Sequence, residues 1–539
     1  MPSPPTEKRQ RVRTKRSRTG CRTCRVRRIK CDETPGACTN CTSTGRSCDY
    51  DMHRLPPTHE IPHLTSALAR PLAAGFRWKM TSDERRCFSH FQNYTVPGLL
   101  ELFESPLWQR VVLQMSYSEP AVYHAVVALS AAQQDMEAYG MPLPGETRNS
   151  VWQQFALEHS VRSFSLLNKR HASQDPTFRA VMVLCCLLFV LLELLQGQYD
   201  RACQHLNSGL LILKELKADR NLVESTSSPI ETCVVAAFAQ LDNQSAFFPL
   251  HGPVFCFDDT IKCHLWLEAH PYAFSSIYEA RQTLDPVTSG VYRYLAVCWP
   301  LSARGVGLNY HSLHLKQGEL LSQLQHYAEA FELFCDSPHS LRNGRETRAA
   351  DIIRVVYKTL SLAVKVSLLP KHSHIIDLYT PEYATQLQSV EDIMSKFPSR
   401  PSISMEPSIV PSLYIIAMGC SDFDIRLRAI EALDGWPHFE GLFDSQWVSL
   451  LGVEKMAIDV LSLRYEGGSS EKESDSGQGS EQGSISGEEL IRLEERIIQL
   501  RDHVTRGHKH SLEEIAASTA YVTAWPCVAL IQEMKARYR

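Results

Sequence analysis

Six cysteines near the amino terminus form a repeated pattern. They are Cys21, Cys24, Cys31, Cys38, Cys41 and Cys48. In each half of the pattern two residues separate the first cysteine from the second, and six separate the second from the third. Two cysteines spaced so closely can bind one metal ion, and zinc prefers four thiolate or imidazole ligands in a tetrahedral arrangement. The spacing therefore predicts metal binding by this segment.

The number of ligands in the segment constrains how a metal can be held. No histidine precedes His53, so the site has to be built from thiolates alone. Six thiolates can give two zinc ions four ligands each only if two thiolates are shared. We therefore predict two Zn²⁺ with two bridging thiolates. Such a cluster carries a net charge of about -2, which nearby Arg and Lys side chains would offset.

Three other uses of the six cysteines have to be weighed. A disulfide knot is one, but the other 11 of the 17 cysteines are scattered as in proteins of a reducing compartment. A four-cysteine iron-sulfur site and a single zinc ion with two spare thiols are the others. Each of these two leaves two regularly spaced cysteines without a role. The pattern favours the two-zinc cluster.

Cations fill most of the segment between Cys24 and Cys31. They are Arg25, Arg27, Arg28 and Lys30. Val26 and Ile29, three residues apart, are expected to share one face of a short helix and to pack against the cluster. Arginine can read guanine in the major groove through paired hydrogen bonds to O6 and N7. The pattern therefore predicts binding to double-stranded DNA, the alternative being cations that only solvate the surface or offset the thiolate charge.

The segment from Cys21 to Asp32 resembles the fungal Zn2Cys6 binuclear zinc cluster family of transcription factors, and the likeness covers about residues 18–50. The resemblance implies that Cys21 and Cys38 bridge the two metals. It also implies that Arg27 and Arg28 read bases, typically at a CGG half-site, with Arg28 as the principal reader. Phosphate contacts are expected from the remaining cations, which are Arg25, Lys30, Arg22 and Arg18.

This resemblance also bears on the place and partners of the protein. It implies a nuclear, sequence-specific regulator of RNA polymerase II transcription that acts with the transcription machinery. Residues 1–48 hold 13 Lys or Arg against three acids, whereas the rest of the chain has a net charge of -14. Such an asymmetry predicts a basic end that meets a polyanion and a body that does not.

The segments flanking the cluster are expected to lack regular structure. Residues 1–20 form a basic arm without an apolar pattern and are predicted to be disordered. Residues 49–80 form a linker whose four prolines exclude a sustained coiled coil; these are Pro56, Pro57, Pro62 and Pro71. Many proteins of this family dimerise at that place. Monomeric DNA binding and a homodimer formed through the body therefore both stay open.

Residues 81–539 are predicted to form a large all-α domain of helical hairpins, so the fold class is mostly α with a small cluster module in front. The domain begins at a capping box of Thr81 and Glu84. A disordered acidic loop rich in Ser and Gly is expected over 466–487. Phrases near Ser118 and Ile425 resemble the fungal-specific regulatory domain, over roughly residues 85–535. The predicted helices include 151–169, 176–195, 199–216, 230–246, 275–284, 317–335, 348–368, 381–396, 409–419, 422–433, 444–464, 488–504 and 512–537.

Several other classes of function find little support in the sequence. The longest uncharged apolar run, 180–192, has 13 residues and is predicted to be a core helix rather than a membrane span. The chain shows no secretory signal, phosphate-binding loop, nucleophile elbow or zinc-protease motif. We therefore expect no enzyme and name no catalytic residue or small-molecule effector. The alternatives are an enzyme with an appended DNA-targeting module and a zinc-dependent interaction protein that does not touch DNA.

Overall fold

The computed structural model describes most of the chain. The described residues are 21–32, 38–46, 48, 55, 78, 80–171, 173, 175–220, 229–245, 274–337, 341, 343–370, 374–397, 400–470, 487–505 and 528. They fall into two compact units, Met1–His90 and Phe91–Arg539, and each is described by itself. The predicted basic arm 1–20 and nearly all of the predicted linker 49–80 lie outside the described residues.

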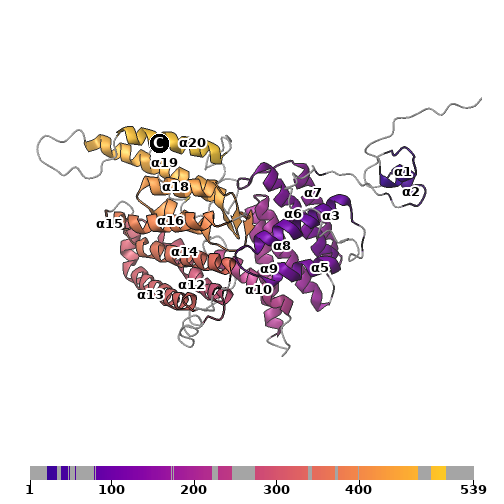
Figure 1. The fold of residues 1–539 in the computed structure, drawn as a ribbon, viewed down its shortest axis with the longest axis horizontal. Helices are drawn as coiled ribbons and strands as arrows, with labels where there is room; N and C mark the ends of the chain where they lie inside the picture. Colours follow the sequence, from indigo (N-terminus) through magenta and orange to yellow (C-terminus); the bar gives the residue numbers. More distant parts are fainter. Residues whose placement is uncertain are drawn as a thin grey trace, which may run out of the picture. The chain divides into compact units, whose positions relative to one another are not determined.

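The described residues of the first unit form two very short helices around the cysteines and one longer helix. These are α1 (Arg22–Val26), α2 (Thr39–Thr42) and α3 (Ser82–His90), of which Figure 1 labels each. The Thr81 N–H donates to Glu84 Oε2 over 2.6 Å, and the Glu84 N–H donates to Thr81 Oγ1 over 3.2 Å. These reciprocal bonds satisfy two donors that the first turn of α3 leaves free. The predicted capping box is thus confirmed.

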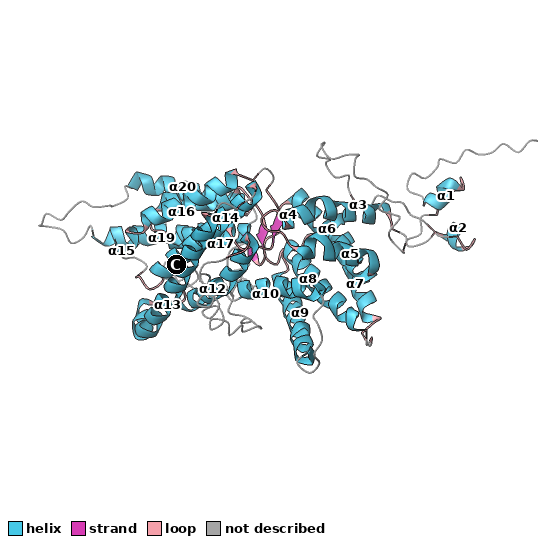
Figure 2. Ribbon diagram, turned by 60° about the horizontal axis from the view of Figure 1, so that its bottom comes forward, coloured by secondary structure: helices cyan, strands magenta, loops and turns pink. Residues whose placement is uncertain are grey.

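The second unit is built almost entirely of helices, which confirms the mostly α fold class (Figures 1 and 2). The described residues of its first part form two π-helical segments and seven α-helices. They are η2 (Phe91–Thr95), α4 (Val96–Leu99), η3 (Leu107–Val111), α5 (Val112–Ser118), α6 (Pro120–Tyr139), α7 (Val151–Asn168), α8 (Pro176–Leu195), α9 (Tyr199–Arg220) and α10 (Pro229–Ser245). Helix α6 packs on α7 and α8, and α8 packs on α9.

Helix α8 occupies the core of this first part. Its segment Thr177–Leu195 is long and apolar enough to cross a membrane by length and composition, with a mean hydropathy of 2.5. Nevertheless, 78% of that apolar window is buried inside the body. A helix that is apolar on all sides is typical of a protein core. The prediction of a core helix over 180–192 is confirmed, although the helix itself is longer than the uncharged run.

The remaining helices form the second part of the body. They are α12 (Ile277–Cys298), α13 (Ala303–Cys335), α14 (Gly344–Val366), α15 (His374–Asp377), α16 (Thr380–Ser395), α17 (Ile409–Gly419), α18 (Phe423–Asp434), α19 (Ser445–Ser470) and α20 (Gly487–Val504). Helix α14 packs against α12, α13, α16 and α17, and α19 packs against α17, α18 and α20. Most neighbours in space are therefore also near in sequence, as expected of helical hairpins.

Three short strands, which the sequence did not predict, form a small sheet among the helices of the body (Figure 2). Strand β1 (Ile403–Ser404) pairs in parallel with β2 (Phe439–Glu440), and β2 pairs antiparallel with β3 (Phe443–Asp444). Each strand has two residues, too few for an alternating pattern to be visible. The sheet therefore depends on tertiary contacts rather than on local sequence.

Two buried carboxylates of this sheet fix the starts of two helices. The Glu440 carboxylate accepts hydrogen bonds from the backbone N–H groups that begin α17; these belong to Ser408, Ile409 and Val410, at 2.7, 3.1 and 2.9 Å. Asp444 accepts from the N–H groups of Gln446 and Trp447 at the start of α19 and from the Tyr199 hydroxyl. An anion is stabilised at a helix N-terminus by the free N–H groups and the helix dipole. The sheet thus holds both helices in place.

Some helix bounds differ from the predictions. Helix α12 continues through Pro286 to Cys298, because its buried face, which includes Leu284 and Val291, continues across the proline. Helix α13 begins at Ala303 rather than at 317. The apolar periodicity did not reveal its first turns, because they are largely exposed and lack an apolar face. Helix α19 runs to Ser470 and α20 begins at Gly487, so the predicted acidic loop 466–487 is wrong in its first five residues and in its last. Its residues 471–486, and the predicted helix 512–537 apart from Val528, lie outside the described residues.

Candidate metal centre and nucleic-acid interface

The two halves of the cysteine pattern share one backbone design. Cys24 lies in α1 and Cys41 lies in α2, each three residues after the first cysteine of its half. The Ile29 N–H donates to the Cys24 carbonyl and the Arg46 N–H donates to the Cys41 carbonyl, both over 3.0 Å. Hydrogen bonds over this span close a helix in the Schellman motif, in which the residue before the donor has a left-handed backbone. Each half thus ends its short helix abruptly.

The left-handed positions of this motif are held by different residue types. Gly45 has φ of 61° and Arg28 has φ of 58°. Among the described residues other than glycine, only Arg28 has a positive φ. Glycine adopts this conformation without strain, whereas other L-residues pay roughly 1–2 kcal/mol. The first half therefore keeps a strained arginine where the second has a glycine.

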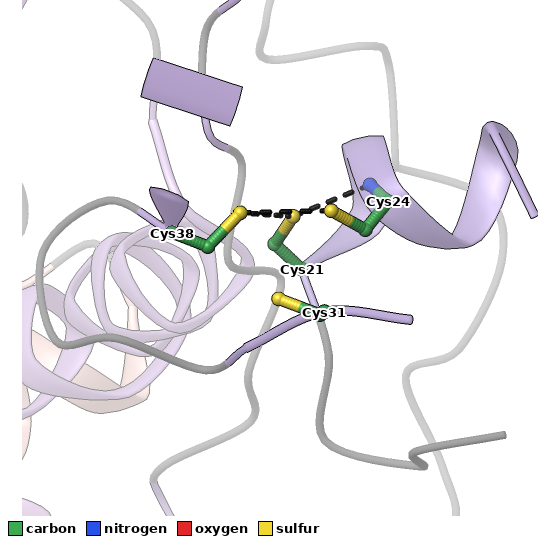
Figure 3. Close-up of side chains that lie close together, drawn as sticks. All are labelled: Cys21, Cys24, Cys31 and Cys38. Carbon is green, nitrogen blue, oxygen red and sulfur yellow. Dashed lines mark hydrogen bonds between the residues drawn. The ribbon is translucent and has the colours of Figure 1, made fainter. Parts of the chain in front are cut away.

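The described sulfur atoms converge in the interior of the module. Figure 3 shows four of them, those of Cys21, Cys24, Cys31 and Cys38. Cys21 Sγ lies 3.7 Å from Cys38 Sγ and 3.6 Å from Cys41 Sγ, and Cys24 Sγ lies 3.5 Å from Cys38 Sγ. These separations far exceed the length of a disulfide bond, about 2.05 Å. Sulfurs at the corners of a tetrahedron about 2.3 Å from a central zinc ion would be roughly 3.8 Å apart. The spacing of the sulfurs fits thiolate ligands of zinc.

The six sulfurs form two groups of four, within each of which the atoms lie no more than 4.8 Å from one another. The first group consists of Cys21, Cys24, Cys31 and Cys38. The second group consists of Cys21, Cys38, Cys41 and Cys48. Cys21 and Cys38 therefore belong to both groups. Two tetrahedral metal ions that share two ligands require this arrangement.

Burial and hydrogen bonding set the protonation of these thiols. Burial raises the pKa of Cys24, Cys41 and Cys48 above the usual range for a thiol. Burial would also raise the pKa of Cys38, but hydrogen bonds from the neighbouring thiols lower it to about 6. A backbone hydrogen bond from Cys41 also lowers the pKa of Cys38. The Cys38 N–H donates to Cys48 Sγ over 3.1 Å, which opposes the rise in the pKa of Cys48. Zinc binds thiolates, so loading this site has to release protons.

The aliphatic residues of the first half do not pack as predicted. Val26 is 75% exposed and Ile29 is 39% exposed, so the expectation that both lie against the cluster is wrong. Helix α1 ends at Val26, and the left-handed backbone of Arg28 turns the chain before Ile29. Their three-residue spacing therefore does not place them on one helical face. The cysteines themselves form the interior of the module.

The predicted DNA-contacting cations are distributed over α1 and the turn that follows it. Arg22 and Arg25 lie in α1, and Arg18 lies outside the described residues. Arg28 and Lys30 are exposed in the turn. Arg27 is partly buried, and its Nη1 donates to the Asn40 carbonyl over 2.9 Å and to Thr44 Oγ1 over 3.2 Å. The turn thus offers two exposed cations beside one that is bound within the module.

Three residues of the second half hold this arrangement together and were missed by the sequence reasoning. Asn40 Nδ2 donates to the Lys30 carbonyl over 2.9 Å, and Thr44 Oγ1 donates to the Asn40 carbonyl over 2.9 Å. Asp32 Oδ2 accepts from the N–H of Thr39 over 3.0 Å and from its hydroxyl over 2.6 Å. The spacing of the cysteines gives no signal for such bonds, because those of Asn40 to Lys30 and of Asp32 to the Thr39 N–H join a side chain to the backbone of the other half.

Two of the three body histidines that lie near apolar residues in the sequence, His124 and His205, are among the described residues. His124 Nδ1 lies 2.9 Å from His159 Nδ1, and burial, with a smaller effect of Arg162, lowers the pKa of His124 to about 4. The ring of His205 lies beside those of Phe164 and Phe189, with centroids 5.8 and 5.3 Å away, and burial lowers the pKa of His205. His251 lies outside the described residues. These surroundings are those of structural histidines in a core.

Comparison with protein families matches two segments of the chain. Residues 19–55 match the fungal Zn(2)-Cys(6) binuclear cluster domain, a domain of two zinc ions that fits the two groups of four sulfurs. Residues 86–260 match the fungal specific transcription factor domain, which spans the helices of the first part of the body. This second match ends well before residue 535, to which the resemblance was expected to extend. No solved structure matches the chain.

Several known proteins are similar to parts of the chain. The aspercryptin biosynthesis cluster-specific transcription regulator atnN of Emericella nidulans is 27% identical over 249 residues, which cover 42% of this chain and 40% of that protein. Transcription regulator lscL of Purpureocillium lilacinum is 27% identical over 239 residues, which cover 41% of this chain and 54% of that protein. The transcriptional regulatory protein moc3 of Schizosaccharomyces pombe is 51% identical over 49 residues, which cover 9% of this chain and 10% of that protein.

The matched segments therefore span about half or less of the length of these relatives. Their names and both family descriptions are those of transcription factors, which agrees with the expectation that this chain is not an enzyme. The chain carries two domains of fungal transcription factors, a Zn(2)-Cys(6) binuclear cluster domain followed by a fungal specific transcription factor domain.

Proposed function

We propose that this protein is a sequence-specific, DNA-binding regulator of transcription that reads CGG-type half-sites with its binuclear zinc cluster. The observation that carries the proposal is the pair of four-sulfur groups that share Cys21 and Cys38, with Arg28 exposed in the turn directly after α1. The matched cluster domain and the transcription regulators among its relatives support the same function.

In this proposal the two groups of sulfurs hold one Zn²⁺ each. Cys24 and Cys31 would hold the first ion and Cys41 and Cys48 the second, while Cys21 and Cys38, which belong to both groups, would serve both ions. When bound, the ions supply structural cross-links and positive charge rather than a reaction. So small a module has almost no apolar interior besides its cysteines, so that metal binding and folding become one event.

The turn after α1 carries the proposed contacts to DNA. Arg28 is exposed and projects from a turn whose backbone is fixed by the Ile29 to Cys24 hydrogen bond. Its guanidinium can form the paired hydrogen bonds that distinguish guanine in the major groove. Lys30 and the basic residues of α1 and the arm contribute phosphate contacts, which set affinity and register without reading sequence. These additional residues are Arg25, Arg22 and Arg18.

The same proposal places the protein in the nucleus, where its partners are double-stranded DNA and the transcription machinery. The basic segment 1–48 supports this, because its net charge of +10 suits a polyanion and an import signal alike. The helical body, with its transcription factor domain, is the part that meets other proteins. A homodimer formed through this body and a monomer on DNA are both compatible with the proposal.

Fluorescence anisotropy with the full chain tests the proposed function. The probes are a labelled duplex that contains one CGG half-site and a duplex of the same composition with that trinucleotide scrambled. We expect preferential binding to the CGG duplex, loss of that preference after zinc is removed with a chelator, and its recovery when zinc is added back. Equal binding to both duplexes by the zinc-loaded chain would overturn the proposal, as would a preference that survives complete zinc removal.

A further inference from the structure

Arg27 and Asn40 join the two halves of the cluster module by reciprocal bonds. The Arg27 guanidinium donates through Nη1 to the backbone carbonyl of Asn40 over 2.9 Å. In return, the Asn40 side chain donates through Nδ2 to the backbone carbonyl of Lys30 over 2.9 Å. The turn of residues 27–30 is therefore attached to Asn40 at both of its ends. We call this pair of bonds the Arg27–Asn40 bracket.

We propose that the Arg27–Asn40 bracket positions Arg28 for base reading, so that Arg27 and Asn40 are positioning residues and Arg27 does not itself read a base. This inference rests on the proposed function, since it assigns a role in the recognition of the same DNA. It departs from what the family resemblance implies for Arg27.

The left-handed backbone of Arg28 is the feature that the bracket holds in place. A left-handed arginine is strained relative to glycine and persists only where the surrounding structure fixes it. The bracket fixes the residue before Arg28 and, through Lys30, the second residue after it. With both ends held, the turn keeps the direction of the Arg28 side chain before DNA arrives. A contact that is already ordered loses less conformational entropy on binding.

The hydrogen bonds of Arg27 argue against a second role in base reading. Its Nη1 is bound both to the Asn40 carbonyl and to Thr44 Oγ1, and its side chain is partly buried while that of Arg28 is exposed. Hydrogen bonds to a charged group are stronger than those between neutral groups. Turning the guanidinium toward a base edge would break them and remove one of the links between the two halves of the module. Arg27 thus holds the turn in place, and Arg28 contacts the base.

Two variants remove one side of the bracket each, and each has a matched control in the same module. Arg27→Gln removes the bond to the Asn40 carbonyl, and Arg46→Gln removes the same charge from an exposed position of the second half. Asn40→Ala removes the bond to the Lys30 carbonyl without changing charge, and Ser43→Ala truncates an exposed neighbour. Zinc content is measured on every preparation, and all four variants are expected to retain the metal of the wild type.

The first readout is discrimination, the ratio of the affinities of the full chain for the CGG duplex and the scrambled duplex. We expect this ratio to fall about tenfold in Arg27→Gln and in Asn40→Ala, within the range that one well-placed base contact provides. Both control variants are expected to keep the wild-type ratio, with Arg46→Gln weaker on both duplexes alike. An unchanged ratio in Asn40→Ala would overturn the proposal.

The second readout is hydrogen–deuterium exchange of the zinc-loaded full chain without DNA, followed in peptides that cover residues 27–31 and 42–47. A positioning role predicts faster exchange of the first peptide in both bracket variants and no change in the second. If Arg27 only contacted DNA, its replacement would leave the free protein unchanged, and the bracket would be refuted. A wild-type chain without CGG preference would overturn the proposed function. The exchange measurement would still test whether the Arg27–Asn40 bracket holds the turn, because it is made without DNA.

Discussion

Arg28 and Gly45 occupy equivalent positions in the two halves of the cluster module, each four residues after the second cysteine of its half, and both have a left-handed backbone. The same helix-ending hydrogen bond follows each of them, to the Cys24 and Cys41 carbonyls. Glycine fulfils the backbone requirement at no cost, so an arginine there needs another reason. Strained residues persist at functional sites, and the proposed base contact provides that reason.

Substitutions at these two positions distinguish the effect of backbone strain on stability from the effect of the side chain on DNA recognition. Arg28→Gly is expected to stabilise the zinc-loaded module by about 1 kcal/mol, because the strain disappears, while preference for the CGG duplex is lost. Gly45→Ala is expected to destabilise the module by a similar amount, although nothing lies within 4 Å of the added methyl group. Resistance of the cluster segment to proteolysis, measured beside anisotropy, reports both effects. A stabilised Arg28→Gly variant that kept full discrimination would refute the role of Arg28.

The sharing of Cys21 and Cys38 between the two sulfur groups makes zinc stoichiometry informative. Cys21→Ser is expected to lose both zinc ions, because this thiol belongs to both groups. Cys48→Ser is expected to retain about one ion, since Cys24 and Cys31 still complete the first group with the bridging thiols. Cys335→Ser, in the body, serves as the control and should keep the wild-type content. Metal analysis of the purified chains checks this, and equal losses in the first two variants would contradict shared ligation.

Much of this centre could be predicted from the sequence because it depends on ligand count and spacing. The repeat from Cys21 to Cys48 indicated a thiolate cluster, and the structure brings all six sulfurs together in two groups of four. The position of Val26 could not be predicted, because the end of α1 depends on the left-handed backbone two residues later. The role of Asn40 also escaped, since its bond to Lys30 joins segments ten residues apart and follows no pattern.

The body shows a similar division between local and tertiary information. Helices such as α7 and α17 follow from apolar periodicity with the predicted bounds or nearly so. The sheet is different, because its two-residue strands are fixed by pairings such as that of Ile403 with Phe439, 36 positions along the chain. The continuation of α12 through Pro286 likewise reflects a buried face that outweighs the local cost of proline.

Lys30 offers a test that separates phosphate contacts from base reading. Lys30→Ala keeps the backbone carbonyl that accepts from Asn40, so the turn should stay in place. Binding to the CGG and scrambled duplexes should weaken by the same factor, and the slope of log K against log salt should become shallower by about 0.9. Lys169→Ala, on the surface of the body, is the matched control. Titrations at several salt concentrations measure the slopes, and a change in discrimination would contradict a pure phosphate contact.

Asp444 predicts how the stability of the body depends on pH. Burial raises its pKa to about 6, although the bonds from Tyr199 and from the backbone of Trp447 and Gln446 oppose this. The folded chain therefore holds a proton that the unfolded chain, with an Asp pKa near 3.9, releases first. This group's contribution to the unfolding free energy thus falls as pH rises from about 4 to about 6.

Asp444→Asn is expected to remove that contribution and to flatten the pH dependence of the melting temperature between about pH 4 and 6. The exposed Asp392→Asn is the control and should leave the profile of the wild type in place. Thermal unfolding followed by circular dichroism at closely spaced pH values provides the comparison. A profile for Asp444→Asn as steep as that of the wild type would show that this carboxyl does not titrate as described.

The most direct test of the central claim is a selection of bound sequences from a pool of randomised duplexes, performed in parallel with the zinc-loaded full chain and with Arg28→Ala. We predict that the wild type enriches CGG trinucleotides and that Arg28→Ala, with its zinc content unchanged, binds the pool without enriching them. Enrichment of the same sequences by both proteins, or of no sequence by the wild type, would contradict the assignment of this cluster as a CGG reader.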